Sequence, residues 1–212
     1  MDSPSLPIEE IRGELLDALQ APSPRILLKA PTGSGKSTGV PPMMDDAGLG
    51  ERGLIVVVQP RRMAARLLAR HVARLRGVEL GKEVGYVVRF ERHISPRTRI
   101  AYVTDGMLER WLTERPALEG VSAVVFDEFH ERSLSGDLSL GRILDLQEGP
   151  RPDMAVAVMS ATLEISGLRD YMGASCRVLE KAGFRCEGIL RAAAVKNGKI
   201  RDMKMYSRLK ED

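Results

Sequence analysis

One short segment constrains this 212-residue chain more than any other. It reads Ala30-Pro-Thr-Gly-Ser-Gly-Lys-Ser-Thr38 and follows an apolar stretch that predicts a buried strand over 25–30. From Gly35 it matches G-K-[ST], the second half of the phosphate-binding loop pattern, and Ala30 stands where that pattern has its first glycine. Small residues let consecutive backbone N–H groups curl around phosphates, and a helix that starts at Lys36 points the positive end of its dipole at them. The segment therefore predicts a strand, a loop and a helix that together bind a triphosphate.

The side chains of this loop suit a triphosphate that carries magnesium. Lys36 can reach the β- and γ-phosphates, and the Ser37 hydroxyl can ligate Mg²⁺. A chance glycine turn is the alternative interpretation, and the strand–loop–helix context argues against it. The expected cofactors are ATP and Mg²⁺, and the candidate ATP-binding residues are Ala30, Pro31, Thr32, Gly33, Ser34, Gly35, Lys36, Ser37 and Thr38.

An acidic pair follows another apolar strand, in the segment Val124-Val-Phe-Asp-Glu-Phe-His130. At the carboxyl end of a strand, Asp127 would lie beside the phosphate-binding loop and bind Mg²⁺ together with Ser37. Glu128 could then orient and deprotonate the water that attacks the phosphate. Alone, a strand that ends in Asp-Glu is weak evidence, and its pairing with the loop is what gives it weight.

Apolar strands alternate with helices along most of the chain. Strands are predicted over 25–30, 54–59, 84–90, 99–104, 121–127 and 154–159, and helices over 7–20, 60–76, 105–114, 137–146 and 163–171. This alternation favours an α/β fold with a parallel sheet flanked by helices on both faces. We expect Pro41 and Pro42 to limit or interrupt the helix that begins at Lys36.

The pattern changes after Gly173. A short helix is expected to end near Gly183, and the dipeptide Asn197-Gly198 predicts a two-stranded hairpin. We therefore divide the chain into an α/β domain over 1–173 and a small C-terminal helix and β-hairpin over 174–212.

Positive charge is concentrated in two places, although the net charge is only +3. Residues 60–100 hold eleven Lys/Arg against three Asp/Glu, and 174–212 hold ten against five. Within the first stretch, arginines recur at every fourth residue of a predicted helix (Arg62, Arg66, Arg70 and Arg74), so they share one stripe. Such a stripe can neutralise nucleic-acid phosphates, and a solvated helix face is an equally good interpretation. Trp111 stands between Leu108 and Leu112, which favours a core position.

Five segments in order resemble the motifs of superfamily 2 helicases. The loop 30–38 resembles motif I, and Asp127-Glu-Phe-His130 resembles the DExH box. The other three segments are Gln59-Pro-Arg-Arg62 (motif Ia), Val103-Thr-Asp-Gly106 (motif Ib) and Ser160-Ala-Thr162 (motif III). His130-Glu-Arg-Ser133 resembles the run that follows the box in DEAH helicases. The residues of the box and of the opening segment Leu6-Pro-Ile-Glu9 are most similar to those of HrpB-type helicases. The resemblance covers roughly residues 5–172.

The resemblance implies a RecA-like P-loop NTPase domain that hydrolyses ATP in response to nucleic acid. It assigns Lys36, Asp127, Glu128 and His130 to the catalytic centre. It assigns the coupling of the nucleotide site to nucleic acid to Ser160, Ala161 and Thr162, together with His130. It places Arg61, Arg62, Thr104, Asp105 and Gly106 along the nucleic-acid backbone.

Two further features of the resemblance bear on activity. Such helicases bind ATP between two RecA-like domains, and nothing after Thr162 resembles the motifs of the second, so we expect one half of a motor whose hydrolysis is impaired. Residues 174–212 resemble the C-terminal end of a GNAT acetyltransferase of the RimJ/RimL type. The [QR]-x-x-G-x-[GA] loop that such enzymes use for acyl-CoA does not occur in the chain.

Three functions therefore remain on the sequence alone. The first is an ATP-hydrolysing, nucleic-acid-binding helicase domain. The second is a non-catalytic nucleotide- or RNA-binding module, or an inactive fusion. The third, acyl transfer, would need the missing loop from another chain. The N-terminus shows no basic-then-apolar signal segment and the apolar runs are short, so a cytoplasmic protein without membrane contact is expected.

Overall fold

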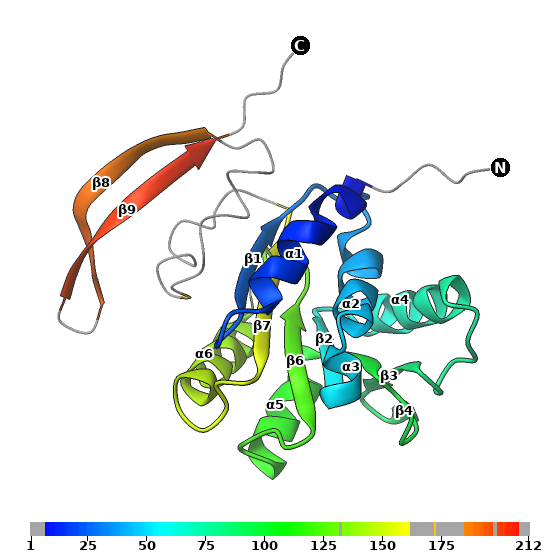
Figure 1. The fold of residues 1–212 in the computed structure, drawn as a ribbon. Helices are drawn as coiled ribbons and strands as arrows, with labels where there is room; N and C mark the ends of the chain where they lie inside the picture. The colour runs from blue at the N-terminus through cyan, green and yellow to red at the C-terminus, as the bar shows by residue number, and fades with distance from the viewer. Residues whose placement is uncertain (1–6, 132, 162–171, 173–184, 197–198, 208–212) are drawn as a thin grey trace.

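A central β-sheet organises the part of the chain that the structure, a computed structural model, describes: residues 7–131, 133–161, 172, 185–196 and 199–207. Within those ranges the sheet has seven strands in the order β1-β7-β6-β2-β5-β3-β4 (Figure 1). The strands are β1 (Arg25–Lys29), β2 (Leu54–Gln59), β3 (Val84–Val88), β4 (Glu91–His93), β5 (Ile100–Thr104), β6 (Val121–Phe126) and β7 (Ala155–Ser160). All neighbouring pairs are parallel except β3 and β4, which are antiparallel.

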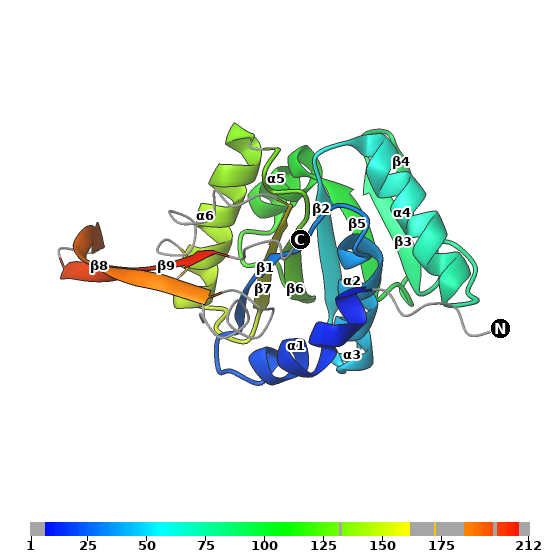
Figure 2. The same ribbon diagram turned by 90° about the horizontal axis from the view of Figure 1, so that it is seen from above.

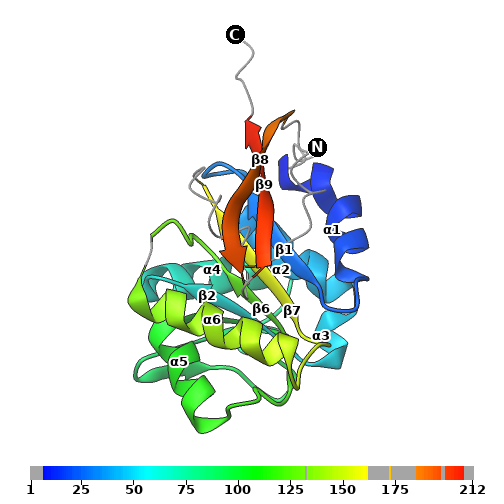
Figure 3. The ribbon, with the colours of Figure 1, turned by 90° about the vertical axis from the view of Figure 1, so that its left-hand side faces the viewer.

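Helices cover both faces of the sheet, as the alternation of apolar stretches predicts (Figures 2 and 3). They are the 3₁₀-helix η1 (Pro7–Ile11), α1 (Arg12–Leu19), α2 (Lys36–Asp46), α3 (Leu49–Arg52), α4 (Arg62–Leu75), α5 (Asp105–Glu114) and α6 (Leu134–Glu148). Buried side chains from η1 and α1–α4 form one core cluster with the sheet, and those from α5 and α6 form another on the opposite face. Trp111 belongs to the second cluster and is 8% exposed, so its predicted core position is confirmed.

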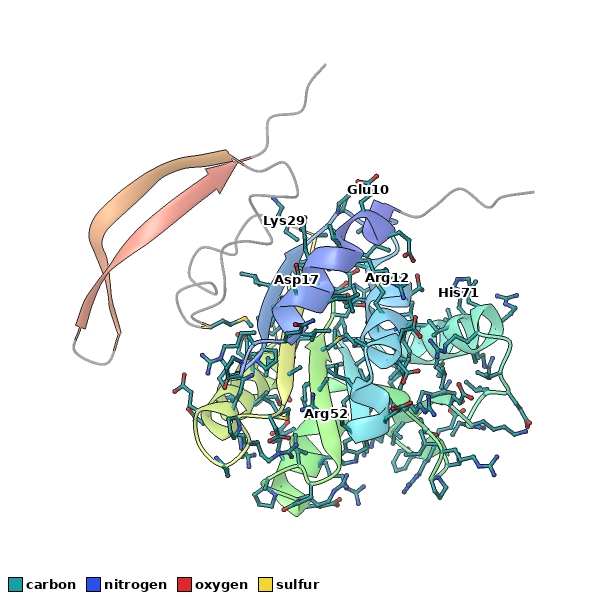
Figure 4. The ribbon with its side chains drawn as sticks, viewed as in Figure 1. Glu10, Arg12, Asp17, Lys29, Arg52 and His71 are labelled. Carbon is teal, nitrogen blue, oxygen red and sulfur yellow. The ribbon has the colours of Figure 1, made fainter. Side chains whose placement is uncertain are left out.

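The register of the parallel strands brings their carboxyl ends to one edge of the sheet. Lys29 at the end of β1 is level with Ser160 at the end of β7, and Gln59 at the end of β2 is level with Thr104 at the end of β5. Figure 4 labels Lys29 at this edge. Each predicted motif continues from one of these strand ends, so the register gathers the motifs at one edge.

Helix α2 passes through Pro41 and Pro42 and continues to Asp46, so the prediction that the prolines limit or interrupt it was wrong. Pro41 cannot donate to the carbonyl of Ser37 four residues earlier, which would leave that acceptor unpaired inside the protein. The buried Tyr102 supplies the missing donor, because its hydroxyl lies 2.9 Å from the Ser37 oxygen. Burial also raises the pKa of the Tyr102 hydroxyl, a group that is protonated and able to donate at neutral pH even without this shift.

Strands β8 (Arg185–Lys196) and β9 (Lys199–Ser207) form a separate antiparallel two-stranded sheet, with Lys196 opposite Lys199. The predicted hairpin about Asn197-Gly198 is confirmed by the strands that flank it, while those two residues lie outside the described part. The predicted helices over 163–171 and before Gly183 also fall outside it. Two short elements, α3 and β4, were not predicted. Among the described residues, no helix is long and apolar enough to cross a membrane.

A substitution at Gly85 tests the close approach of β3 and β4. A Cβ atom there would overlap the backbone carbonyl oxygen of His93 and lie 2.9 Å from Ile94 Cγ2. We expect Gly85→Ala to lower the free energy of unfolding by about 1–3 kcal/mol in urea denaturation. Gly13→Ala is the matched control, because a Cβ on that α1 residue meets no atom within 4 Å. Equal stabilities of the two variants would contradict the described strand contact.

Candidate active site

The loop between β1 and α2 has the conformation that a phosphate-binding loop needs. Gly33 and Gly35 have φ angles of 81° and 88°, in the left-handed region that favours glycine. Gly35 is the residue before the first turn of α2, so the helix begins at Lys36 as predicted. The amides of Lys36 and Ser37, in the first turn, precede the hydrogen bonds that Thr38 and Gly39 donate to the Gly35 carbonyl, and can therefore donate to an anion.

The N-terminal segment supports this loop, a contact that the sequence pattern did not indicate. The amide of Ile8 donates to the carbonyl oxygen of Ser34 at 3.2 Å. Ile8 is 2% exposed and packs against Gly39, where a Cβ would lie 2.8 Å from Ile8 Cγ2. Helix η1 thus fixes the loop from one side, and a bulkier residue at Gly39 would separate the two elements.

Asp127 lies buried immediately beyond β6, 4% exposed, against the start of α2. Its carboxylate accepts hydrogen bonds from the Ser37 hydroxyl and from Gln59 Nε2, the latter at 2.6 Å. The backbone amide of Glu128 donates to the other carboxylate oxygen at 2.9 Å. Burial raises the pKa of Asp127, and these hydrogen bonds oppose that effect. The predicted meeting of Ser37 and Asp127 is therefore present in the structure.

Glu128 and Lys36 form an ion pair, with 2.9 Å between Lys36 Nζ and Glu128 Oε1. The Lys36 side chain is 3% exposed and the Glu128 side chain 23%, so the pair is largely shielded from water. Glu128 has a φ of 49°, which is uncommon for a residue with a side chain. The loop lysine and the acidic strand end, which the sequence separates by more than ninety residues, therefore share one site.

His130 connects this pair to the strand end of β7. Its Nδ1 lies 3.3 Å from Glu128 Oε2 and 3.4 Å from the amide nitrogen of Ala161. Ser160 is buried at the end of β7, and its carbonyl accepts a hydrogen bond from the Ala30 amide at 3.1 Å. The structure thus brings together the segments that resemble motif I, the DExH box and the first two residues of motif III. The third residue of motif III, Thr162, lies outside the described residues.

Three of the five predicted nucleic-acid residues line one groove, and the other two, Arg61 and Asp105, do not. Arg62, Thr104 and Gly106 line an open groove of about 970 Å³, which also borders Phe90 and Arg110. Arg61 is exposed and pairs with Glu131, at 3.1 Å from Nε to Oε2 and 3.0 Å from Nη2 to Oε1.

Like Arg61, Asp105 does not line that groove. It is half-buried at the start of α5 and accepts a hydrogen bond from the Ser133 hydroxyl at 2.8 Å. Ser133 also caps α6, because its hydroxyl accepts from the Gly136 amide at 2.9 Å. Asp105 therefore joins α5 to the segment that follows the acidic strand end.

The arginine stripe on α4 is engaged mostly within the protein. Arg66 pairs with Glu91 of β4, and Arg70 hydrogen-bonds the hydroxyl of Tyr86. Arg74 lies 3.4 Å from His71, which Figure 4 places on the outer side of α4. Of the four stripe residues, Arg62 is the one that borders the groove. For the other three, the interpretation as a helix face without nucleic-acid contacts is favoured.

The donor set fits a magnesium-bound triphosphate. Mg²⁺ prefers oxygen ligands and is usually held by one or two carboxylates together with substrate phosphates, and here the Asp127 carboxylate and Ser37 hydroxyl touch. Among the described residues, the buried Ser34 hydroxyl has no hydrogen-bond partner, so the loop keeps a further donor that suits phosphate oxygens. Gln59 and Tyr102 were not predicted as supporting residues. The sequence offered one signal for Gln59, a polar residue at the end of a buried strand. It offered no local signal for the role of Tyr102.

Comparisons with known proteins agree with this geometry. The family model of the DEAD/DEAH box helicases matches residues 10–171. The ATP-dependent RNA helicase HrpB of Escherichia coli is 44% identical over 168 residues, which are 79% of this chain and 20% of that protein. The probable ATP-dependent RNA helicase DHR2 of Saccharomyces cerevisiae is 41% identical over 169 residues, 79% of this chain and 23% of that protein.

The fold is also similar to solved structures. A crystal structure of the E. coli DEAH/RHA helicase HrpB superposes with a TM-score of 0.74 at 43% identity, covering 80% of this chain and 21% of that one. A second crystal structure, of the E. coli DExH-box NTPase HrpB, superposes with a TM-score of 0.76 and covers 82% of this chain. The predicted α/β fold with a mostly parallel sheet is therefore confirmed. The chain spans about a fifth of the length of the curated relatives it matches.

Replacing Ser133 tests the link between α5 and α6, and we expect a pH-dependent result. Burial raises the pKa of Asp105, whereas the Ser133 hydrogen bond lowers it by favouring the charged form. Because its folded-state pKa is raised, the contribution of Asp105 to stability is present at low pH and lost as pH rises. Ser133→Ala removes the donor to the carboxylate and the helix cap, so it should destabilise the fold by about 1–2 kcal/mol, more at pH 7.5 than at pH 4.

The measurement is urea denaturation at both pH values, with Ser135→Ala as control. Ser135 also bonds a carboxylate of α5, that of Glu109, but at an exposed position, so its loss should change stability by under about 0.5 kcal/mol. Ser133→Thr should retain most of the stability. An equal effect of Ser133→Ala at the two pH values would show that the charge of Asp105 is not involved.

Proposed function

The chain belongs to the DEAD/DEAH box helicase family, and from that premise we propose that it binds ATP with Mg²⁺ and hydrolyses it in response to RNA. The observation that carries the proposal is the convergence of Lys36, Ser37, Asp127 and Glu128 at one strand edge. We further propose that residues 1–173 form the ATP-binding domain and 174–212 a separate unit that resembles the end of a GNAT acetyltransferase.

In this proposal, the loop residues 30–38 bind the triphosphate. The amides at the start of α2 and the Lys36 ammonium contact phosphate oxygens, and Ser37 and Asp127 hold the magnesium ion. The bound ion would neutralise charge on the β- and γ-phosphates. Gln59 keeps the Asp127 carboxylate in position through the 2.6 Å hydrogen bond to its Oδ2.

Glu128 is proposed as the residue that orients water and accepts its proton. Its carboxylate lies at the Lys36 ammonium, at the end of the loop that would hold the γ-phosphate. A phosphate that binds Lys36 competes with Glu128, which leaves the carboxylate available to accept a proton. His130, Ser160, Ala161 and Thr162 are proposed to couple this step to nucleic acid. The contact of His130 Nδ1 with the Ala161 amide supports that role.

Arg61, Arg62, Thr104 and Gly106 are proposed to contact the nucleic-acid backbone. The groove of about 970 Å³ beside Arg62, Thr104 and Gly106 supports this placement. RNA is proposed rather than DNA because two relatives, HrpB and DHR2, are named as RNA helicases. Asp105, whose carboxylate also accepts a hydrogen bond from Ser133, is proposed to contact the backbone together with those four residues.

A second RecA-like domain is proposed as the partner for full activity. The matched region is 20% and 23% of the length of the two relatives, so their helicase activity does not transfer to these residues alone. We expect weak hydrolysis by this chain, because a partner domain contributes arginine side chains that related NTPases need for fast turnover. A module that binds ATP without hydrolysing it is the alternative, and the next experiment separates the two.

Two substitutions divide ATP binding from hydrolysis. Lys36→Ala should abolish the thermal stabilisation by Mg-ATP and the release of phosphate, because the loop loses its cation. Glu128→Gln should keep the thermal stabilisation while phosphate release falls by about 10²–10⁴-fold, the usual contribution of a general base. Both are measured with and without single-stranded RNA.

Lys82→Ala and Glu79→Gln are the matched controls, because the two residues are exposed and pair with each other. They should behave as the unmodified chain does. Stabilisation by Mg-ATP without any phosphate release from the unmodified chain would favour the non-catalytic module. No stabilisation at all would refute the proposed site.

The salt dependence of RNA binding tests the assignment of Arg62. Each phosphate contact with a single strand adds about 0.7 to the slope of log affinity against log salt. Arg62→Ala should therefore reduce the slope by about 0.7, as measured by fluorescence anisotropy between 50 and 200 mM salt. Arg74→Ala removes the same charge from the far end of α4 and should leave the slope unchanged. Equal slopes for both variants would place the RNA elsewhere.

A further inference from the structure

A single four-residue turn, 128–131, pairs with two positively charged side chains, those of Lys36 and Arg61, and both are proposed to bind phosphates. The amide of Glu131 donates to the carbonyl of Glu128 at 2.8 Å and closes the turn. At its first residue, Glu128 pairs with Lys36 of the ATP loop at 2.9 Å. At its last residue, Glu131 pairs with Arg61, which follows β2. Each cation thus contacts a carboxylate from the same turn.

The Arg61–Glu131 pair has the geometry that a guanidinium also uses with phosphate. Two separate nitrogens, Nε and Nη2, contact the two oxygens of one carboxylate at 3.1 and 3.0 Å. This two-bond arrangement is specific to arginine and fits carboxylates and phosphates alike. A backbone phosphate would therefore bind the same two guanidinium nitrogens, Nε and Nη2, that now contact Glu131.

The pair is also accessible to a large ligand. The Arg61 side chain is 73% exposed and the Glu131 side chain 32%, and exposed ion pairs contribute only about 0.2–1 kcal/mol. A charged polymer can therefore displace Glu131 at little cost. By contrast, Arg66 is tied to Glu91 in a cluster that also includes Tyr86 and His93.

We propose that Glu131 competes with nucleic-acid phosphates for Arg61, and that its release loosens the turn that positions Glu128. The inference rests on the proposed function, and it gives Glu131, which lies in the run 130–133, a positioning role that the resemblance does not assign. The two ion pairs anchor opposite ends of one short turn, so losing one weakens the other. RNA at Arg61 and ATP at Lys36 should therefore favour each other's binding, and to the same extent in both directions.

The test is Glu131→Gln in the full chain, with the affinity for fluorescein-labelled oligouridylate measured by anisotropy without nucleotide. The substitution removes the competing charge and should tighten RNA binding about two- to five-fold, the size expected from freeing an exposed ion pair. It should also reduce the gain in RNA affinity that Mg-ATP produces in the unmodified chain. A purely structural role for Glu131 would not strengthen RNA binding.

Glu114→Gln is the matched control for general electrostatics. It removes one negative charge from the groove beside Arg62 without contacting Arg61, and its own partner is Arg110. The second control places Glu131→Gln in an Arg61→Ala background, where the competition no longer exists. There, Glu131→Gln should have no larger effect than Glu114→Gln. Thermal unfolding verifies that each variant is folded, and Glu131→Asp, which shortens the side chain but keeps its charge, should give an intermediate affinity.

The outcomes separate the inference from the function on which it rests. If the unmodified chain binds RNA and Glu131→Gln matches Glu114→Gln, the competition is refuted and the proposed function stands. An effect of Glu131→Gln that persists without Arg61 also refutes it. If neither the unmodified chain nor Glu131→Gln binds RNA, the proposed RNA-dependent function fails and the inference fails with it.

Discussion

The ion pair between Lys36 and Glu128 is the contact on which the candidate site depends. An ammonium group that is 3% exposed is destabilised by several kcal/mol unless an opposite charge compensates it. Glu128 provides this compensation, and it can do so because β6 ends beside the start of α2. The same pairing explains why the chain tolerates a buried lysine, and in the proposed function a phosphate takes the place of the carboxylate. Stability and ligand binding therefore make opposing demands on one pair of residues.

Local sequence was sufficient to predict the elements that present this pair. Strand β2 and helix α5 lie within the predicted residues, because each is a continuous apolar or amphipathic stretch bounded by polar residues. The site was predictable for a related reason. In a parallel sheet, carboxyl ends share an edge, so a loop after one strand and an acidic pair after another can meet without any knowledge of the intervening chain.

The features that were missed all depend on contacts between distant residues. The continuation of α2 through Pro41 requires the Tyr102 hydroxyl, which comes from the fifth strand of the chain. The hydrogen bond of Asp105 was missed as well, because its donor, the Ser133 hydroxyl, comes 28 residues later in the chain. Neither partner is indicated by spacing or propensity, since a hydrogen bond between two elements depends on how they pack. Sequence patterns thus indicated which residues are important more reliably than what each residue contacts.

The arginines of residues 60–100 show how this limit affects functional assignment. Their number suggests an extended phosphate-binding surface, but the availability of each guanidinium depends on its counter-charge. Arg66 pairs with Glu91, which also accepts a hydrogen bond from the Tyr86 hydroxyl. Among the described residues, the carboxylate that pairs with Arg61 is that of the exposed Glu131. An arginine in an exposed pair can exchange its carboxylate for a phosphate, and one in a cluster cannot do so without disturbing the strands around it. Affinity for nucleic acid should therefore follow the few exchangeable arginines rather than the total positive charge.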